Sequence, residues 1–465
     1  MIENQLTIQR EVALSGRGLH TGENVTLTFK PAPADYGVKF KRIDVEGQPE
    51  IPALANWVQS TDRGTCIGTE GALIYTVEHV LAALTGCQID NCLIELNGSE
   101  IPIMDGSSLP FVEKLEEAGM KDLGVKRSFL TLRQPICYQD LENGVEIIAI
   151  PHDTYQLSVL VDYDTQVLGS QNATLYHMED FREEIASSRT FSFLHELEFL
   201  LDNGLIKGGD LNNAIVYVDK QVSDDTFKKL QKAFKKDNVS VKPNGILDNL
   251  DLYHPNEAAR HKLLDVLGDL ALIGKPLKAK IFATKPGHYA NTEFSKKVLR
   301  EVRKMARGPQ PPHYNPEAEP VHDVREVMNI LPHRPPFLLV DKITELTNDE
   351  VVGVKNVTMN ESYFIGHFPG APVMPGVLQI ESMAQVGGIL ALSSVPDPEN
   401  YLTYFLKMDE VKFKHKVVPG DTLLFHLKLD EPIRRGLVKM QGYAFVGEQL
   451  VAEAKLMAQI VKEKN

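Results

Sequence analysis

Cysteine is scarce in this sequence. The chain of 465 residues has four, Cys66, Cys87, Cys92 and Cys137, which all lie in its first third and form no Cys-x-x-Cys pair. This pattern argues against a disulfide framework and against a thiolate zinc cluster, and it is typical of proteins from a reducing compartment. We therefore expect a cytoplasmic protein.

The chain also lacks an excess of positive charge and a long apolar run. Its formal net charge is −14, with 49 Lys and Arg against 63 Asp and Glu, which argues against a nucleic-acid partner. No apolar run approaches the ~18 residues that a membrane-spanning helix needs. The first residues, MIENQLTIQREVALSG, have no basic segment followed by an apolar one, so we predict neither a signal peptide nor a transmembrane segment.

Proline, by contrast, is concentrated in one place. Five prolines fall within residues 309–320, in the segment ARGPQPPHYNPEAEPVHD. Such a segment forms neither a helix nor a central strand and tends toward stiff polyproline II. We therefore predict a linker over residues 306–321 that joins two folded units.

The first unit mixes strand-like and helix-like runs. VTLTFK and CLIEL read as strands, whereas residues 76–86 and 260–270 each read as an apolar helix with polar residues on one face. This indicates two similar α+β subdomains, 1–125 and 126–305. A lysine-rich segment, residues 223–240, is predicted to be a solvated surface helix.

The second unit, residues 322–465, has one long apolar stretch from Pro375 to about Ser394. Its later segments alternate, as in TLLFHLKLD, and a hairpin is predicted to turn near Gly447. One buried helix with a mostly antiparallel sheet is again an α+β arrangement.

The segment RHKLLDVLGDL holds the first candidate site. His261, Asp265 and Asp269 are spaced four residues apart, which places them on one helix face. A histidine and an aspartate four residues apart, like His261 and Asp265, are more often a hydrogen-bonded surface pair than a metal site. A catalytic zinc needs three protein ligands and a position for water, so the third ligand must come from elsewhere. His79, in TVEHV, is the candidate for this third ligand. The carboxylate of Glu78, directly before it, suits a base that takes a proton from water.

Several sequence segments of the first unit, taken in order, resemble those of one known enzyme family. GLHTGENVTLTFKPAPADYGVKF, TVEHVLAALTGCQIDNCLIELNGSEIPIMDGSS, SSRTFSF, ARHKLLDVLGDL and KPGHYAN resemble UDP-3-O-acyl-N-acetylglucosamine deacetylase, a zinc amidase of lipid A synthesis. The resemblance covers about residues 1–300. It implies two similar α+β layers that face each other, one Zn²⁺ per chain bound by His79, His261 and Asp265, and Glu78 as the general base.

The same resemblance implies further roles. Thr190 would hydrogen-bond the oxyanion, and His288 would be the cationic partner or general acid for the leaving amine, with Asp269 orienting it. Lys262 would reach the anionic part of the UDP-sugar lipid precursor. Phe191 and Phe193 would line the acyl passage, whose insert matches residues 204–218.

The second candidate site lies in GHFPGAPVMPGVLQIESMAQVGG. His367 falls in a turn-rich loop, and Pro375 is well placed to open a helix that carries Glu381 two turns in, among apolar residues. Glu381 either faces water at an interface or does proton chemistry. Dehydration of a 3-hydroxyacyl thioester needs a base for the C2 proton, help for the departing hydroxyl, and a donor for the thioester oxygen.

This segment, with LPHRPPFLLVDKI and DEVKFKHKVVPGD, resembles 3-hydroxyacyl-(acyl carrier protein) dehydratase over residues 322–463. The resemblance implies a hot-dog fold, no cofactor, His367 as the base and Glu381 as the group that activates the leaving hydroxyl. It implies the backbone N–H of Gly388 as a carbonyl donor. It also implies an active site shared between two subunits of a homo-oligomer, a dimer or a trimer of dimers. Five basic residues would suit an acidic acyl carrier protein: Lys412, Lys414, Lys416, Arg434 and Arg435.

The sequence therefore predicts a bifunctional enzyme, a deacetylase fused to a dehydratase. Three alternatives stay open. In one alternative, the first unit is a metal-stabilised binding module without turnover. In the other two, the second unit is an oligomerisation platform or a hot-dog thioesterase.

Overall fold

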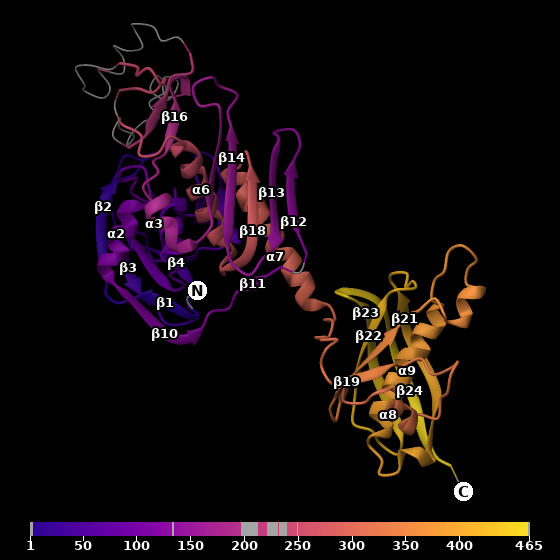
Figure 1. Cartoon of the computed structure of the whole chain (residues 1–465). Helices are drawn as coiled ribbons and strands as arrows, with labels where there is room; N and C mark the ends of the chain where they lie inside the picture. The colour runs from indigo at the N-terminus through magenta and orange to yellow at the C-terminus, as the bar shows by residue number, and fades with distance from the viewer. Residues whose placement is uncertain are drawn as a thin grey trace. The chain divides into compact units, whose positions relative to one another are not determined.

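The computed structural model describes residues 3–132, 134–196, 213–220, 231, 240–248 and 250–463. Its contacts divide the chain into two compact units, Met1–Arg303 and Lys304–Asn465 (Figure 1). Within the described residues, no helix is long and apolar enough to cross a membrane. Residues 204–212 of the predicted acyl-chain insert lie outside this description, as do residues 223–230 and 232–239 of the predicted surface helix.

The first unit contains two sheets with one topology. The first sheet has the order β2-β3-β9-β4-β5 and the second has the order β12-β13-β18-β14-β15. In each, the central strand is antiparallel to the neighbour on one side and parallel to the neighbour on the other. The strands of the first sheet are β2 (Val12–Arg17), β3 (Asn24–Pro31), β4 (Val38–Arg42), β5 (Glu50–Pro52) and β9 (Cys92–Leu96). Those of the second are β12 (Ile136–Asp140), β13 (Val145–Pro151), β14 (Gln156–Asp162), β15 (Ser170–Leu175) and β18 (Leu277–Thr284).

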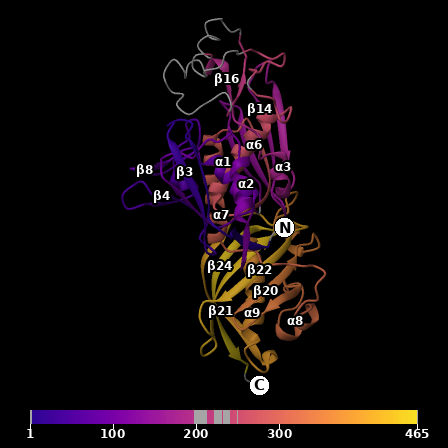
Figure 2. The same ribbon diagram turned by 90° about the vertical axis from the view of Figure 1, so that its left-hand side faces the viewer.

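A helix precedes the central strand of each sheet. These helices are α1 (Glu78–Gly86) and α6 (Glu257–Leu270), and they pack against each other between the two sheets (Figure 2). One buried apolar cluster takes residues from both halves, so the halves share a core. The chain order and topology repeat, which confirms the predicted pair of α+β layers.

Gly268 permits the close approach of α1 and α6. A Cβ atom at this position would lie 2.0 Å from the backbone oxygen of Glu78 and 2.7 Å from its carbonyl carbon. Any other residue would therefore force the two helices apart at the point where they carry the candidate site.

Smaller elements surround these layers. They are α2 (Leu109–Ala118), α3 (Phe181–Glu184) and α7 (His288–Arg307), the paired strands β1 (Asn4–Ile8) and β10 (Met120–Lys126), the three-stranded sheet of β6 (Val58–Ser60), β7 (Cys66–Thr69) and β8 (Ala72–Ile74), β11 (Leu130–Thr131), which pairs with β18, and the parallel pair β16 (Phe191–Phe193) and β17 (Ile215–Tyr217).

The second unit is one six-stranded antiparallel sheet around one long helix. The helix is α9 (Gly376–Leu392), which begins directly after Pro375, and the sheet order is β19-β20-β22-β23-β24-β21. The strands are β19 (Lys342–Leu346), β20 (Glu350–Asn356), β21 (Tyr401–Phe413), β22 (Thr422–Leu429), β23 (Leu437–Val446) and β24 (Gln449–Lys462). Five of these strands contact α9, which confirms the predicted hot-dog arrangement, and the β23–β24 hairpin turns at Gly447 as predicted. The short helix α8 (Val324–Ile330) begins with a capping box formed by Asp323 and Glu326.

Part of the proline-rich segment packs onto this second unit. Tyr314 lies against a buried cluster of Val354, Leu424 and Phe445, and Lys342 Nζ lies 5.1 Å from the centroid of the Tyr314 ring. Leu423 and Phe425 belong instead to the cluster that includes the α9 residues. Because side chains alternate along a strand, Tyr314 covers the sheet face opposite α9.

Candidate active sites

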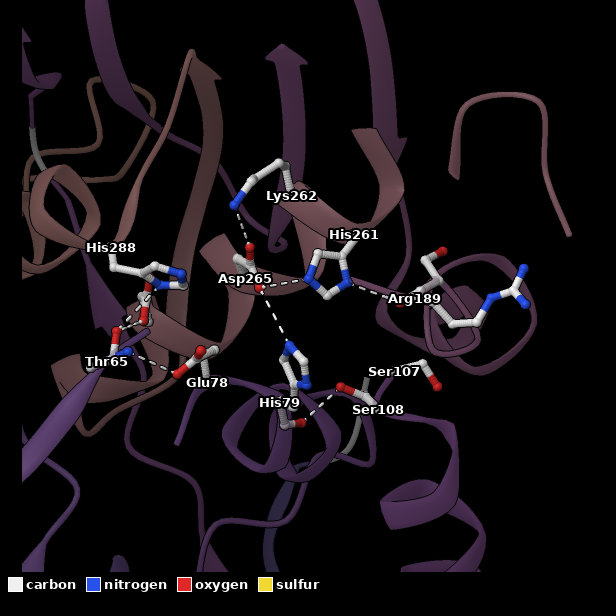
Figure 3. A network of polar contacts seen from close by, with 12 residues as sticks. Thr65, Glu78, His79, Ser107, Ser108, Arg189, His261, Lys262, Asp265 and His288 are labelled. Atoms are coloured by element: carbon white, nitrogen blue, oxygen red, sulfur yellow. Dashed lines mark hydrogen bonds and ion pairs between the residues drawn. The ribbon is translucent and has the colours of Figure 1, made fainter. Parts of the chain in front are cut away.

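The pairing of α1 with α6 brings the three predicted metal ligands together. The ligand atoms of His79, His261 and Asp265 lie within 4.8 Å of one another (Figure 3). Asp265 Oδ1 is 3.3 Å from His261 Nε2 and 3.7 Å from His79 Nε2. All three residues are buried. The two four-residue-spaced side chains of α6 thus face the one on α1.

The protonation of this cluster fits a divalent metal. His261 Nδ1 lies 3.0 Å from the backbone oxygen of Ser188; a carbonyl only accepts, so Nδ1 carries the hydrogen and Nε2 keeps its lone pair toward the cluster. Burial and the neighbouring His261 lower the pKa of His79 to about 3, and burial lowers the pKa of His261. Two neutral imidazoles and a carboxylate form a donor set that zinc accepts.

The second oxygen of Asp265 is held by Lys262. Lys262 Nζ donates to Asp265 Oδ2 at 2.9 Å. Burial alone would raise the pKa of Asp265, but His261 and Lys262 outweigh it and hold that pKa below its usual range. Lys262 Nζ also lies 5.8 Å from the centroid of the Phe191 ring. In this structure Lys262 is thus an ion-pair partner of a metal-ligand candidate, and its contact with substrate stays a prediction.

A second cluster, in which two of three residues are buried, lies beside the first. It consists of Glu78, Asp269 and His288, whose polar atoms also lie within 4.8 Å of one another. Asp269 Oδ2 accepts from His288 Nδ1 at 2.9 Å and from Asn291 Nδ2 at 2.8 Å, and Asp269 Oδ1 accepts from Thr65 Oγ1 at 2.5 Å. The Asp269 carboxylate therefore holds the ring of His288, and the role of this pair in the reaction stays a prediction.

The surroundings raise the pKa of both Glu78 and His288. Burial raises the pKa of Glu78 to about 7, and the backbone N–H of Thr65 donates to Glu78 Oε2 at 3.0 Å. Burial alone would lower the pKa of His288, but the carboxylates of Asp269 and Glu78 outweigh it and raise that pKa to about 9. Near neutral pH the cluster offers a carboxylate poised to take a proton and an imidazolium able to give one.

The residue predicted to bind the oxyanion, Thr190, directly precedes β16, and the two predicted to line the acyl passage, Phe191 and Phe193, lie on that strand. Thr190 is anchored by its backbone N–H, which donates to the oxygen of Gly106 at 2.8 Å. The Phe191 ring meets the His261 ring edge-on, with 6.3 Å between centroids. Phe193 packs in a separate apolar cluster with Tyr217. The structure thus places Phe191 beside the predicted metal ligand His261, and Phe191 also packs against the cluster that contains Phe193.

Some residues that build this site were not predicted. Thr65 bonds both Glu78 and Asp269, and Arg189 forms a buried ion pair with Glu257, the first residue of α6, at 2.8 Å. Because Arg189 lies between Ser188 and Thr190, this pair fixes both at the start of α6. An arginine or threonine in sequence is usually solvated, so no local signal marks either one.

In the second unit, Glu381 projects from α9 into a network of buried amides. Gln385 Nε2 donates to Glu381 Oε1 at 3.0 Å and to the oxygen of Phe337 at 2.8 Å, while Gln385 Oε1 accepts from the N–H of Leu339 at 2.8 Å. His333 Nε2 lies 3.7 Å from Glu381 Oε1. Sequence reasoning missed Gln385, although its position four residues after Glu381 places it on the same helix face.

His367 lies in the loop before α9. Its Nδ1 is 2.7 Å from the oxygen of Val373, so Nδ1 carries the hydrogen and Nε2 is left to act as a base. No hydrogen bond or ion pair joins His367 to Glu381 within the described part of one chain. Gly388 lies in the interior of α9 with Leu331 packed near it. Interior N–H groups already bond within a helix, and its role as a carbonyl donor stays a prediction.

Comparisons with known proteins agree with this division. Residues 5–234 and 228–300 match the model of the LpxC family, UDP-3-O-acyl N-acetylglycosamine deacetylase, and residues 331–455 match that of the FabA-like domain. A bifunctional enzyme LpxC/FabZ from Bacteroides thetaiotaomicron is 50% identical over 460 residues, 99% of each chain. One from Porphyromonas gingivalis is 46% identical over 464 residues, 100% of each chain.

Single-function relatives match the first unit. A UDP-3-O-acyl-N-acetylglucosamine deacetylase from Chlamydia pneumoniae is 38% identical over 301 residues, which are 64% of this chain and 98% of that protein. The first unit therefore corresponds to a whole deacetylase, and the second unit adds a separate domain. This chain belongs to the LpxC family of UDP-3-O-acyl-N-acetylglucosamine deacetylases and carries a FabA-like domain in its C-terminal part.

Proposed function

We propose that this protein is a bifunctional enzyme. Its first unit deacetylates UDP-3-O-(3-hydroxyacyl)-N-acetylglucosamine in lipid A synthesis, and its second unit dehydrates (3R)-hydroxyacyl-acyl carrier protein to the trans-2-enoyl product in fatty acid synthesis. The observation that carries the first activity is the adjacency of two clusters, a buried metal-type donor set and an acid–base set of which only His288 is partly exposed. The full-length match to bifunctional LpxC/FabZ enzymes supports the pair.

His79, His261 and Asp265 would hold the zinc of the first unit. Zinc bound there would lower the pKa of a water molecule and polarise the substrate carbonyl. Glu78, with its pKa near 7, takes a proton from the attacking water. Thr190 would donate to the oxyanion, and His288 would deliver a proton to the leaving amine nitrogen.

In the second unit, His367 takes the C2 proton and Glu381 protonates the departing C3 hydroxyl. Because no polar contact joins them in the described part of one chain, we infer that the site is completed by a second copy. The edge strand β21 supports this inference, since among the described strands it pairs with β24 alone and it exposes Tyr404, Leu406 and Met408. A homo-oligomer through the hot-dog unit would cover these side chains.

An acidic acyl carrier protein is the proposed partner of the second unit. Of the basic residues predicted to meet it, Lys412 and Lys414 are paired with Glu453 at 3.1 and 3.2 Å. Lys416 has no ion pair among the described residues, so it is the better candidate for contact with carrier. We also propose a cytoplasmic location, because all four cysteines are unpaired.

Crossed substitutions test the two activities in one chain. Glu78→Gln removes the base of the first unit and should lower kcat for deacetylation roughly 10²- to 10⁴-fold, with dehydration unchanged. Glu381→Gln should do the reverse. Release of free fatty acid by the second unit would instead indicate a thioesterase. If each variant keeps both activities, or if each loses both, the assignment of two independent sites is wrong.

A further inference from the structure

A cavity lies in the first unit at the C-terminal ends of α1 and α6, away from the predicted metal ligands. Its volume is about 540 Å³, within the range of small-molecule sites. Both halves of the unit line it, together with the connection between them at residues 127–129. Its lining residues, all of which the structure describes, include none of the predicted site residues. The cavity is therefore separate from the deacetylase site and independent of both proposed activities.

The wall of the cavity is largely aliphatic. Leu81 and Leu84 come from α1, and Leu267 and Leu270 from α6. Each of these four is less than 5% exposed in the whole molecule, so they form a tightly packed apolar floor that water scarcely reaches. Phe129 lies at the connection between the halves. Such a floor favours a hydrocarbon chain, which gains free energy by leaving water.

The rim of the cavity is positively charged although the chain carries a net charge of −14. Two carboxylates line the cavity, Asp90 and Glu179, against four cations, Lys39, Arg127, Lys275 and Lys278. Arg127 Nε and Asp90 Oδ1 pair at 2.8 Å, and Lys39 lies 3.8 Å from Glu50. Among the described residues, two lysines and the carboxylate of Glu179 are left without an ion pair, an excess of one positive charge.

Lys275 and Lys278 have no ion pair among the described residues. Lys275 Nζ donates to Ser128 Oγ at 3.1 Å, and Lys278 Nζ lies 4.8 Å from the centroid of the Phe129 ring. Both ammonium groups thus lie beside the same short connection, at one side of the apolar floor. Two unpaired cations next to a hydrocarbon surface match a ligand with an anionic end and an apolar body.

We propose that this cavity binds a single acyl chain that ends in an anionic head. The chain lies along the leucines of α1 and α6, and the head lies at Lys275 and Lys278. The proposal commits to a long-chain carboxylate over a neutral lipid because of the two unpaired lysines. It commits to an acyl chain over a flat, polar ring because leucine side chains from both α1 and α6 line the cavity.

Laurate is the probe, titrated calorimetrically into the full-length protein, with dodecanol and hexanoate as comparisons. Laurate should bind, hexanoate should bind far more weakly because it lacks apolar length, and dodecanol should lack the contribution of the head. Lys275→Gln with Lys278→Gln should weaken laurate binding roughly two- to thirtyfold, since each of two exposed ion pairs contributes about 0.2–1 kcal/mol. The same double variant should bind dodecanol as the wild type does.

Lys280→Gln is the matched control, because Lys280 lies on the same strand, β18, but does not line the cavity. It should bind laurate as the wild type does. The KM for deacetylation should be unchanged in both variants. If the double variant binds laurate as tightly as the wild type, the proposal is overturned.

Hydrogen exchange on the wild-type protein gives a second test that needs no variant. Laurate should slow exchange at residues 81–90 and 267–278. Protection confined to residues 188–193 would place the chain in the predicted acyl passage, and protection confined to the second unit would place it in the dehydratase site. Either of these results would overturn the proposal.

Discussion

Replacing Gly268 with alanine should separate the two helices that carry the deacetylase site. The new Cβ would lie 2.0 Å from the Glu78 oxygen, whereas ordinary contact begins at 3.4 Å, so α1 and α6 must move apart by about 1.4 Å at this point. Glu78 and His79 lie on α1, and His261 and Asp265 lie on α6. The substitution therefore changes the distances between metal ligands without removing any of them.

The expected effect on activity is large and the effect on folding is small. Metal sites tolerate shifts of about 0.2 Å in ligand distances, and a displacement of about 1 Å can cost ~10²-fold in rate. We expect kcat/KM for deacetylation to fall by about 100-fold or more, with weaker zinc binding. Overpacking costs about 1–3 kcal/mol, and alanine returns about 1 kcal/mol of helix propensity, so the unit should stay folded.

The assay compares deacetylation, dehydration and bound metal in one preparation. Gly308→Ala is the matched control, because a Cβ there meets only the Lys304 oxygen, at 3.8 Å. Both variants should dehydrate substrate normally, and circular dichroism should show that each is folded. A folded Gly268→Ala protein with wild-type kcat/KM and full metal content would refute the argument from helix approach.

Three further outcomes are expected. Chelation should abolish deacetylation, zinc should restore it, and dehydration should not change; a parallel loss of dehydration would contradict separate sites. In metal-free protein, the raised pKa of His288, about 9 against an ordinary 6.5, stabilises the fold fully below pH 6.5 and progressively less as the pH rises through 9. Urea midpoints should fall across that interval in the wild type and less so in Asp269→Asn, and equal slopes would argue against the pairing. Gln385→Leu removes the amide that donates to Glu381 and should slow dehydration about tenfold or more, since one preorganising donor is worth roughly that; an unchanged rate would show that Glu381 is oriented by other groups.

The sequence predicted the parts of the site that follow a helical period. The four-residue spacing of His261, Asp265 and Asp269 put them on one face, and the two layers and the hot-dog unit are as expected. The roles of the individual site residues were predicted from the family resemblance, because spacing along one helix cannot show that His79 lies next to α6. The structure supplies that contact, and the residue roles remain predictions.

Long-range partners could not be predicted. Thr65 meets Asp269 across 204 positions of sequence, and Arg189 meets Glu257 across 68. Neither pair has a local pattern, because each depends on how the layers pack. Tyr314 is a similar case, since proline density predicted a stiff spacer but said nothing about an aromatic ring that covers the outer face of a sheet.

The repeated topology of the first unit has a consequence for its origin. Two halves that share one strand order, each with a helix before its central strand, are what duplication of an ancestral gene produces. The predicted metal ligands lie where these two halves meet. The ancestor would have had that surface as a contact between separate, identical molecules. On our proposal for the second unit, its catalytic centre also forms where two copies meet. The same chain would then contain one interface between two copies that covalent fusion has made permanent. It would contain another such interface whose formation still depends on protein concentration.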